Sequence, residues 1–141
     1  MRKYSYENER LAGLAKVVKL SAVLFFATII VLALMLRHLT VIYIKQSLGR
    51  LSALCGCVVA ASGSSCGITY LMGGGYDEVA MAVKNMIANL TGMICDGAKP
   101  SCALKLASGV STALLSAMMA MEHRCVSKLE GIIDEDVDRS I

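Results

Sequence analysis

Six cysteines are the residues of this 141-residue chain whose type and spacing are best suited to chemistry. They are Cys55, Cys57, Cys66, Cys95, Cys102 and Cys125. We expect a reducing compartment, because no small-residue cleavage site follows the basic and apolar N-terminal segment, as a secretory signal would require. In a reducing compartment, clustered thiols indicate metal binding or catalysis more than disulfides.

Cys95 and Cys102 flank a segment that should form a loop. Gly97 and Pro100 lie between them, and proline does not fit the interior of a helix. A bent loop can bring both sulfurs toward one centre. We expect Ser101 to cap a helix that begins with Cys102, where free backbone N–H groups and the helix dipole favour a thiolate. These N–H groups can also donate hydrogen bonds to the sulfides of a cluster.

A third thiolate for the same site must come from Cys55, Cys57 or Cys66. Cys55 and Cys57 are two positions apart, so on a helix they point to different faces, and we expect at most one of them to join the site. Three thiolates with one open position suit a catalytic [4Fe–4S] centre, in which the free iron acts as a Lewis acid.

Other interpretations of the same residues stay open. Zinc sites more often contain closely spaced cysteine pairs or clustered histidines, whereas His38 and His123 are isolated here. Free cysteine is also among the most buried residue types, so all six can be ordinary thiols. Asp96 and Lys99 either orient a substrate and tune a cluster or simply stabilise a turn.

The elements that must position these residues are predicted to be helices. The apolar periodicity, the single proline and the absence of clean strand alternation indicate an all-α fold: a compact helical domain with small-residue helix packing and a cysteine-bearing loop at 91–100. The expected helices cover 11–44 with a break near 37–38, 52–61, a short stretch at 66–72, 78–90 after a cap at Asp77, 102–122, and a last helix opened by 134–136.

Two helices have predicted core positions. In 78–90 these are Val79, Val83, Met86, Ile87 and Leu90. In 102–122 the large apolar residues are available for a core: Leu104, Val110, Leu114, Leu115, Met118 and Met121. The run Gly73–Gly75 is expected to end the preceding helix and form a turn, since no phosphate-binding motif accompanies it.

The uncharged run Leu20–Leu36 raises the question of a membrane. As a helix it is slightly short of the roughly 30 Å hydrocarbon core of a bilayer. A helix that is apolar on all sides is either buried in a large protein or inserted in lipid. We favour the buried helix, because the sequence stays apolar beyond His38, and keep a membrane span as the alternative.

Composition excludes two broad classes. Apolar residues make up 56% of the chain and charged residues 18%, which is not the composition of a disordered protein. The net charge of +3 is small, and the chain has no Trp and only two Phe. We therefore expect no nucleic-acid partner.

Two stretches of the sequence resemble a known enzyme family. Leu51–Cys55, followed by Gly92–Lys105 with the sequence GMICDGAKPSCALK, closely resembles the C-terminal part of the L-cysteine desulfidases, which are relatives of the iron–sulfur L-serine dehydratase α chain. Gly67–Gly74 and Glu130–Asp134 are also similar to that family. The resemblance covers 39–141, so we predict a serine dehydratase α-chain-like iron–sulfur domain there and a divergent, apolar helical segment at 1–38.

The resemblance implies a cofactor and a reaction. In this family three cysteines hold a [4Fe–4S] cluster, and the positions that match are Cys55, Cys95 and Cys102. The open iron is thought to bind the leaving group or carboxylate of a small amino-acid substrate. Elimination across Cα–Cβ of L-cysteine or L-serine then gives an enamine, which hydrolyses to pyruvate and ammonia, with sulfide or water released.

The resemblance also implies that something is missing. Family members are longer, and their N-terminal part carries a further active-site cysteine and a substrate loop. We therefore expect a cytoplasmic fragment or subunit of a carbon–sulfur or carbon–oxygen lyase that needs an N-terminal catalytic partner, and that assembles with it or as a homo-oligomer. The alternatives are a membrane-associated helical protein anchored by residues 20–36 and an inactive remnant.

Overall fold

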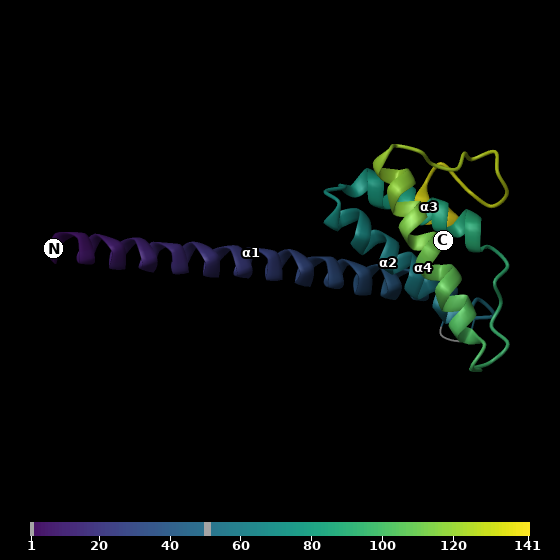
Figure 1. Cartoon of the computed structure of the whole chain (residues 1–141). Helices are drawn as coiled ribbons and strands as arrows, with labels where there is room; N and C mark the ends of the chain where they lie inside the picture. Colours follow the sequence, from purple (N-terminus) through teal and green to yellow (C-terminus); the bar gives the residue numbers. More distant parts are fainter. Residues whose placement is uncertain (1, 50–51) are drawn as a thin grey trace. The chain divides into compact units, whose positions relative to one another are not determined.

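The computed structural model describes residues 2–49 and 52–141 (Figure 1). Its helices are α1 (Arg2–Leu48), α2 (Gly56–Leu71), α3 (Tyr76–Leu90), α4 (Cys102–Met121) and α5 (Val137–Ser140). In these described ranges there is no strand, and the one sheet-like feature is an isolated antiparallel bridge between Leu54 and Ile94. The predicted all-α class is therefore confirmed.

The chain divides into two compact units, Met1–Leu32 and Ala33–Ile141. The first is helical from Arg2 as part of α1, and its large apolar side chains from Leu14 onward are exposed. Because α1 is continuous from Arg2 to Leu48, the predicted break near residues 37–38 is wrong, and the helix begins before the predicted start at residue 11. No proline interrupts this sequence, so every backbone N–H after the first turn finds its helical acceptor.

In the second unit, glycines let the last part of α1 approach α2 closely. A Cβ atom added at Gly63 would lie 2.6 Å from the carbonyl oxygen of Arg37, and one at Gly67 would lie 3.1 Å from that of Ala33. Such distances leave no room for a side chain, so the missing Cβ atoms set the spacing of the two helices.

The predicted interruption of α2 at residues 62–65 does not occur. Ser62 Oγ donates to the carbonyl of Val58 at 3.0 Å, within the helix. Ser65 Oγ donates to the carbonyl of Ala113 at 3.0 Å and so joins α2 to α4. Both buried hydroxyls thus have an acceptor. The low helix propensity of serine suggested a break here, but these small side chains fit the close packing of the helices.

The turn before α3 is formed by glycine, as predicted, but its cap differs. Gly73 has φ +93°, a conformation that side chains disfavour. The N-cap of α3 is Gly75, whose N–H donates to Glu78 Oε2 at 2.8 Å, so Asp77 lies inside the first turn and is not the cap. Val83, Met86 and Leu90 are buried as expected, whereas Val79 and Ile87 are half-buried.

Helix α4 buries its small residues and exposes its large ones, which corrects the predicted core. Its buried positions are Gly109, Thr112, Ala113, Ser116, Ala117 and Ala120. Leu104 is 72% exposed and Val110 67% exposed, and Leu114, Leu115 and Met118 are exposed as well. The reason is the short distance between α2 and α4: a Cβ added at Gly109 would lie 3.0 Å from Cβ of Ala61.

The C-terminal segment is held to α3 by an asparagine. Asn85 Nδ2 donates to the carbonyl of Arg124 at 3.0 Å, and its Oδ1 accepts from the N–H of Val126 at 3.0 Å. The acidic segment opens α5 as predicted, since the Asp136 carboxylate accepts from the N–H of Asp138 at 3.0 Å. Residues 39–141 lie within the second unit, while the proposed family boundary at 38/39 stays a prediction.

Candidate functional site

A backbone pairing joins the segments that carry Cys55 and Cys95. The N–H of Cys55 donates to the carbonyl of Met93 at 3.1 Å, and the N–H of Cys95 donates to the carbonyl of Ala53 at 2.7 Å. Leu54 and Ile94 lie opposite each other in this antiparallel bridge. Two cysteines separated by forty positions therefore sit on paired backbone, an arrangement that helical spacing rules do not foresee.

Cys55 is the buried member of the site. Its side chain is 3% exposed, and the residue is the N-cap of α2 with extended dihedral angles. Burial is the largest influence on its pKa and raises it, but the N–H and thiol of Cys57 and the charge of Lys105 act in the other direction. The net effect lowers the pKa of Cys55, so this environment favours a thiolate.

Cys57 has the opposite balance. Burial and the neighbouring thiol of Cys55 raise its pKa. Which of the two thiols serves as a ligand stays a prediction.

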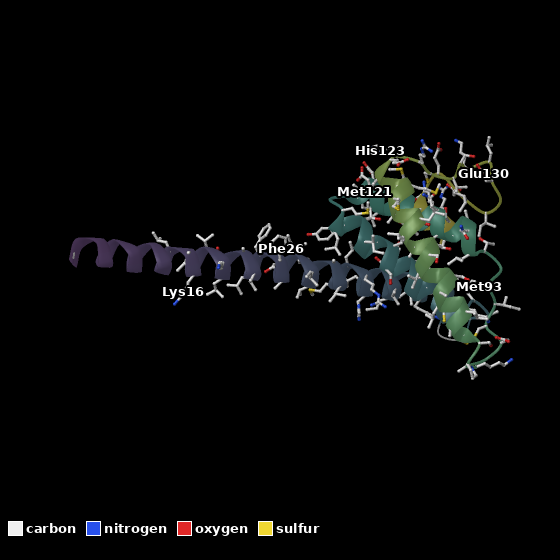
Figure 2. All side chains as sticks on the ribbon, viewed as in Figure 1. Lys16, Phe26, Met93, Met121, His123 and Glu130 are labelled. Atoms are coloured by element: carbon white, nitrogen blue, oxygen red, sulfur yellow. The ribbon has the colours of Figure 1, made fainter. Side chains whose placement is uncertain are left out.

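The loop between α3 and α4 carries the other two cysteines. Figure 2 shows Met93, at the start of this loop, near one end of α4, with Met121 at the other end. Cys95 is exposed, and Cys102 is the half-buried first residue of α4. The thiol of Cys102 donates to the carbonyl of Gly97 at 3.7 Å across the turn.

Ser101 precedes α4 but does not cap it with its side chain. It already has helical dihedral angles, φ −65° and ψ −13°, whereas a capping hydroxyl needs extended ones. The cap predicted there is wrong, although the predicted start of the helix at Cys102 is confirmed. The first N–H groups of α4 are not free, because those of Cys102, Ala103 and Leu104 donate to the carbonyls of Lys99, Pro100 and Ser101.

Lys105 ties the loop to α4, and the sequence analysis did not find it. Its Nζ donates to the carbonyl of Ile94 at 3.0 Å and to Asp96 Oδ1 at 2.9 Å. Lys99 Nζ donates to the other carboxylate oxygen of Asp96 at 2.9 Å. The two lysines, Lys105 first, lower the pKa of Asp96 to about 2. The available signal was the spacing, because Lys105 lies one helical turn after Cys102.

The remaining cysteines lie away from this arrangement. Cys66 is fully buried in α2, and burial raises the pKa of its thiol to about 11. The thiol of Cys125 donates to the carbonyl of Met81 at 3.9 Å, and burial raises its pKa too. A raised pKa makes a thiol a poor nucleophile and a poor metal ligand, so we assign both cysteines a structural role. All six cysteines are free.

The fit of a [4Fe–4S] cluster depends on donor type as well as placement. Within the described ranges, no group of three or more His, Cys, Asp or Glu side chains is arranged around a single metal ion. The thiolates of a cluster bind different irons, so they need not converge on one point. The donor set at the paired segments and the start of α4 is chemically suitable, and the assignment of Cys55, Cys95 and Cys102 stays a prediction.

Comparison with known proteins gives the family. Residues 12–141 match the family model described as serine dehydratase alpha chain. A UPF0597 protein of Bacteroides thetaiotaomicron is 84% identical over 109 residues, covering 77% of this chain and 25% of the relative. A second, from Oleidesulfovibrio alaskensis, is 51% identical over 109 residues, covering 77% of this chain and 26% of the relative.

The chain therefore spans about a quarter of the length of these curated relatives. No solved structure matches it. The family match also extends into the predicted N-terminal segment 1–38. By the extent of the match and the identity to these relatives, the chain belongs to the serine dehydratase alpha chain family.

Proposed function

We propose that this chain is the cluster-binding part of a cytoplasmic iron–sulfur lyase of the L-cysteine desulfidase or L-serine dehydratase type. The observation that supports it is the backbone pairing of the Cys55 and Cys95 segments, with Lys105 linking the paired strand-like segment to the helix that Cys102 begins. Family membership supports the same class of protein.

In this proposal Cys55, Cys95 and Cys102 hold the [4Fe–4S] cluster. The cluster, when bound, supplies an open iron as a Lewis acid for the leaving group or carboxylate of L-cysteine or L-serine. The products are pyruvate, ammonia and sulfide or water. The chain itself contributes thiolate ligands, and the dipole of α4 favours negative charge at Cys102, the first residue of that helix.

The reaction is proposed to need a further part of the family's fold, supplied in the same chain or as a separate subunit. The relatives are about four times as long as the segment they share with this chain. The exposed apolar face of α4, formed by Leu104, Val110, Leu114, Leu115 and Met118, is where we propose that this part packs. Large apolar faces of this kind mark interaction surfaces.

Anaerobic reconstitution with iron and sulfide tests the cluster. We expect the visible absorbance of a [4Fe–4S] cluster in the wild-type chain and its loss in Cys95→Ala and in Cys102→Ala. Cys125→Ala is the matched control, because that thiol faces the carbonyl of Met81 and has no role in the site. A wild-type chain that takes up no iron refutes the proposal.

A membrane-associated protein is the second candidate, and α1 is the observation that favours it. Residues Gly13–Leu48 form a helix that is long and apolar enough to cross a bilayer, and little of its most apolar stretch is buried. Helix α4 also meets the length and composition criterion, with more of it buried. Such helices are weak indications, since core helices and signal sequences share these properties.

Carbonate extraction of cell membranes separates the two candidates. A chain that spans the bilayer stays in the membrane pellet, whereas a cytoplasmic lyase part is released. Retention of the full chain together with iron uptake would mean that the cluster-binding part is anchored.

A further inference from the structure

We propose that Lys105 is the positioning residue of the three-cysteine site, holding the Cys95 loop against α4 and fixing one positive charge at this loop. The inference rests on the proposed function for the cluster itself. It gives a role to a residue that is neither a proposed cluster ligand nor part of the proposed reaction.

The contacts of Lys105 support the positioning part. Its ammonium group reaches from α4 back to the loop and binds two acceptors there, the carbonyl of Ile94 at 3.0 Å and Asp96 Oδ1 at 2.9 Å. These acceptors directly precede and follow Cys95. The lysine side chain is only 25% exposed, so these charge-assisted bonds are less screened than surface ion pairs.

The other links between the loop and α4 lie next to Cys102. The N–H groups of Cys102, Ala103 and Leu104 donate to loop carbonyls at Lys99, Pro100 and Ser101, and the Cys102 thiol donates to Gly97. Loop residues 95–101 are exposed, so apolar burial contributes little to their placement. The two bonds from Lys105 are the ones that join the residues on either side of Cys95 to α4.

The charge of Lys105 supports the electrostatic part. Its ammonium group is bonded to the residues on either side of Cys95, and Lys105 lies one helical turn after Cys102, so one positive charge is fixed at this end of the site. A fixed cation beside a cluster held by three thiolates stabilises the reduced, more negative state and raises the reduction potential.

Lys99 provides a matched control. It also donates to Asp96 at 2.9 Å, but its side chain is 53% exposed and this bond stays within the loop. Lys99→Met therefore removes one lysine from the same carboxylate without removing the link to α4.

The first experiment uses the metal-free full chain and hydrogen exchange of the backbone amides. We expect Lys105→Met to accelerate exchange at Cys95 on the order of tenfold, the loss that corresponds to one charge-assisted hydrogen bond, and Lys99→Met to leave it unchanged. Asp96→Asn removes the charge from one of the two acceptors and leaves the bond to the carbonyl of Ile94, so its effect should be smaller than that of Lys105→Met. Equal exchange in all variants overturns the positioning role.

The second experiment measures the midpoint reduction potential of the reconstituted cluster. We expect a lower potential for Lys105→Met, a value near wild type for Lys105→Arg, and no change for Lys99→Met. If Lys105 acted only by holding the loop, the potential would not follow the charge at this position, and Lys105→Arg would not restore it. An unchanged potential in Lys105→Met overturns the electrostatic role. If the wild-type chain binds no iron, the proposed function fails, while the exchange experiment still decides the link.

Discussion

At the scale of single residues, the same side-chain type has different chemistry at different positions. Cys55 and Cys66 are both almost fully buried. Cys55 lies at the start of α2, where hydrogen bonds from Cys57 and the charge of Lys105 together outweigh burial and lower its pKa. Cys66 lies in the middle of α2, where burial dominates and raises its pKa. Neighbouring hydrogen-bond donors and charges, rather than burial alone, decide whether a buried cysteine favours the thiolate form.

The thiol of Cys66 should make stability fall at alkaline pH. Its pKa is raised from the ordinary value of 9.0 to about 11, so between these values the unfolded chain releases a proton that the folded chain keeps. The folded state therefore loses stability as pH rises through this window, by about 2 kcal/mol in total. We expect urea unfolding from pH 8 to about pH 11 to show this loss in wild type and to show less of it in Cys66→Ala.

Cys66→Ala also leaves a small cavity, which lowers stability by an amount that does not depend on pH. The comparison is therefore between the slopes of stability against pH. Parallel curves for the two proteins would contradict the assigned pKa.

At the scale of elements, glycines at the helix contacts decide how closely the helices pack. Gly63 faces Arg37 and Val41 of α1, and Gly109 faces Ala61 of α2. Elsewhere small residues such as Ala113 and Ala117 line the contacts of α4. Close packing through small residues leaves the large residues of α4 on its outer face, since both cannot occupy one interface.

Adding one methyl group at Gly63 should loosen the contact between α1 and α2. Its Cβ would lie 2.6 Å from the backbone oxygen of Arg37 and 2.6 Å from Val41 Cγ2, and the backbone oxygen has no easy way to move. We expect Gly63→Ala to lower the free energy of unfolding by about 1–3 kcal/mol in urea titrations.

Gly56→Ala is the control for this substitution. No atom lies within 4 Å of the Cβ position there, and Ala favours helix, so this variant should be neutral or slightly more stable. Similar losses in the two variants would show that Gly63 does not set the helix spacing.

The outer face of α4 should tolerate charge while its inner face should not. Val110 is 67% exposed, whereas Ala117 is fully buried. We expect Val110→Glu to change the free energy of unfolding by less than about 0.5 kcal/mol and to reduce self-association in light scattering. Ala117→Glu should cost roughly 3 kcal/mol or more, because it buries an unpaired carboxylate. Strong destabilisation by Val110→Glu would mean that this face is covered within the chain.

At the scale of the whole molecule, the sequence was most informative where structure is set locally. The turn at Gly73 and the start of a last helix at the acidic segment 134–136 depend on neighbouring residues and were predicted correctly, whereas the local caps predicted at Asp77 and Ser101 were wrong. The buried face of α4 was predicted wrongly. Large apolar residues were assigned to the core, but the short distance between α4 and α2 leaves room only for small ones. The pairing of Cys55 with Cys95 and the role of Lys105 depend on contacts between distant segments, which no local spacing encodes.

The division into units predicts that residues 33–141 fold without residues 1–32. The cut falls inside α1 and must keep Ala33 and Arg37, whose carbonyl groups lie against Gly67 and Gly63. The removed part of α1 has large apolar side chains that are exposed, so its loss removes little burial. We expect the chain 33–141 to keep its helical circular dichroism and a cooperative urea transition with a midpoint close to that of the full chain.

A second truncation, starting at residue 49, controls this comparison because it also removes the part of α1 that packs on α2. It should lose cooperativity, since the glycine surface of α2 then has nothing against it. The chain 33–141 should also leave the membrane fraction if residues 1–32 are what retain the full chain there. A chain 33–141 that unfolds without a cooperative transition would show that the two units depend on each other for stability.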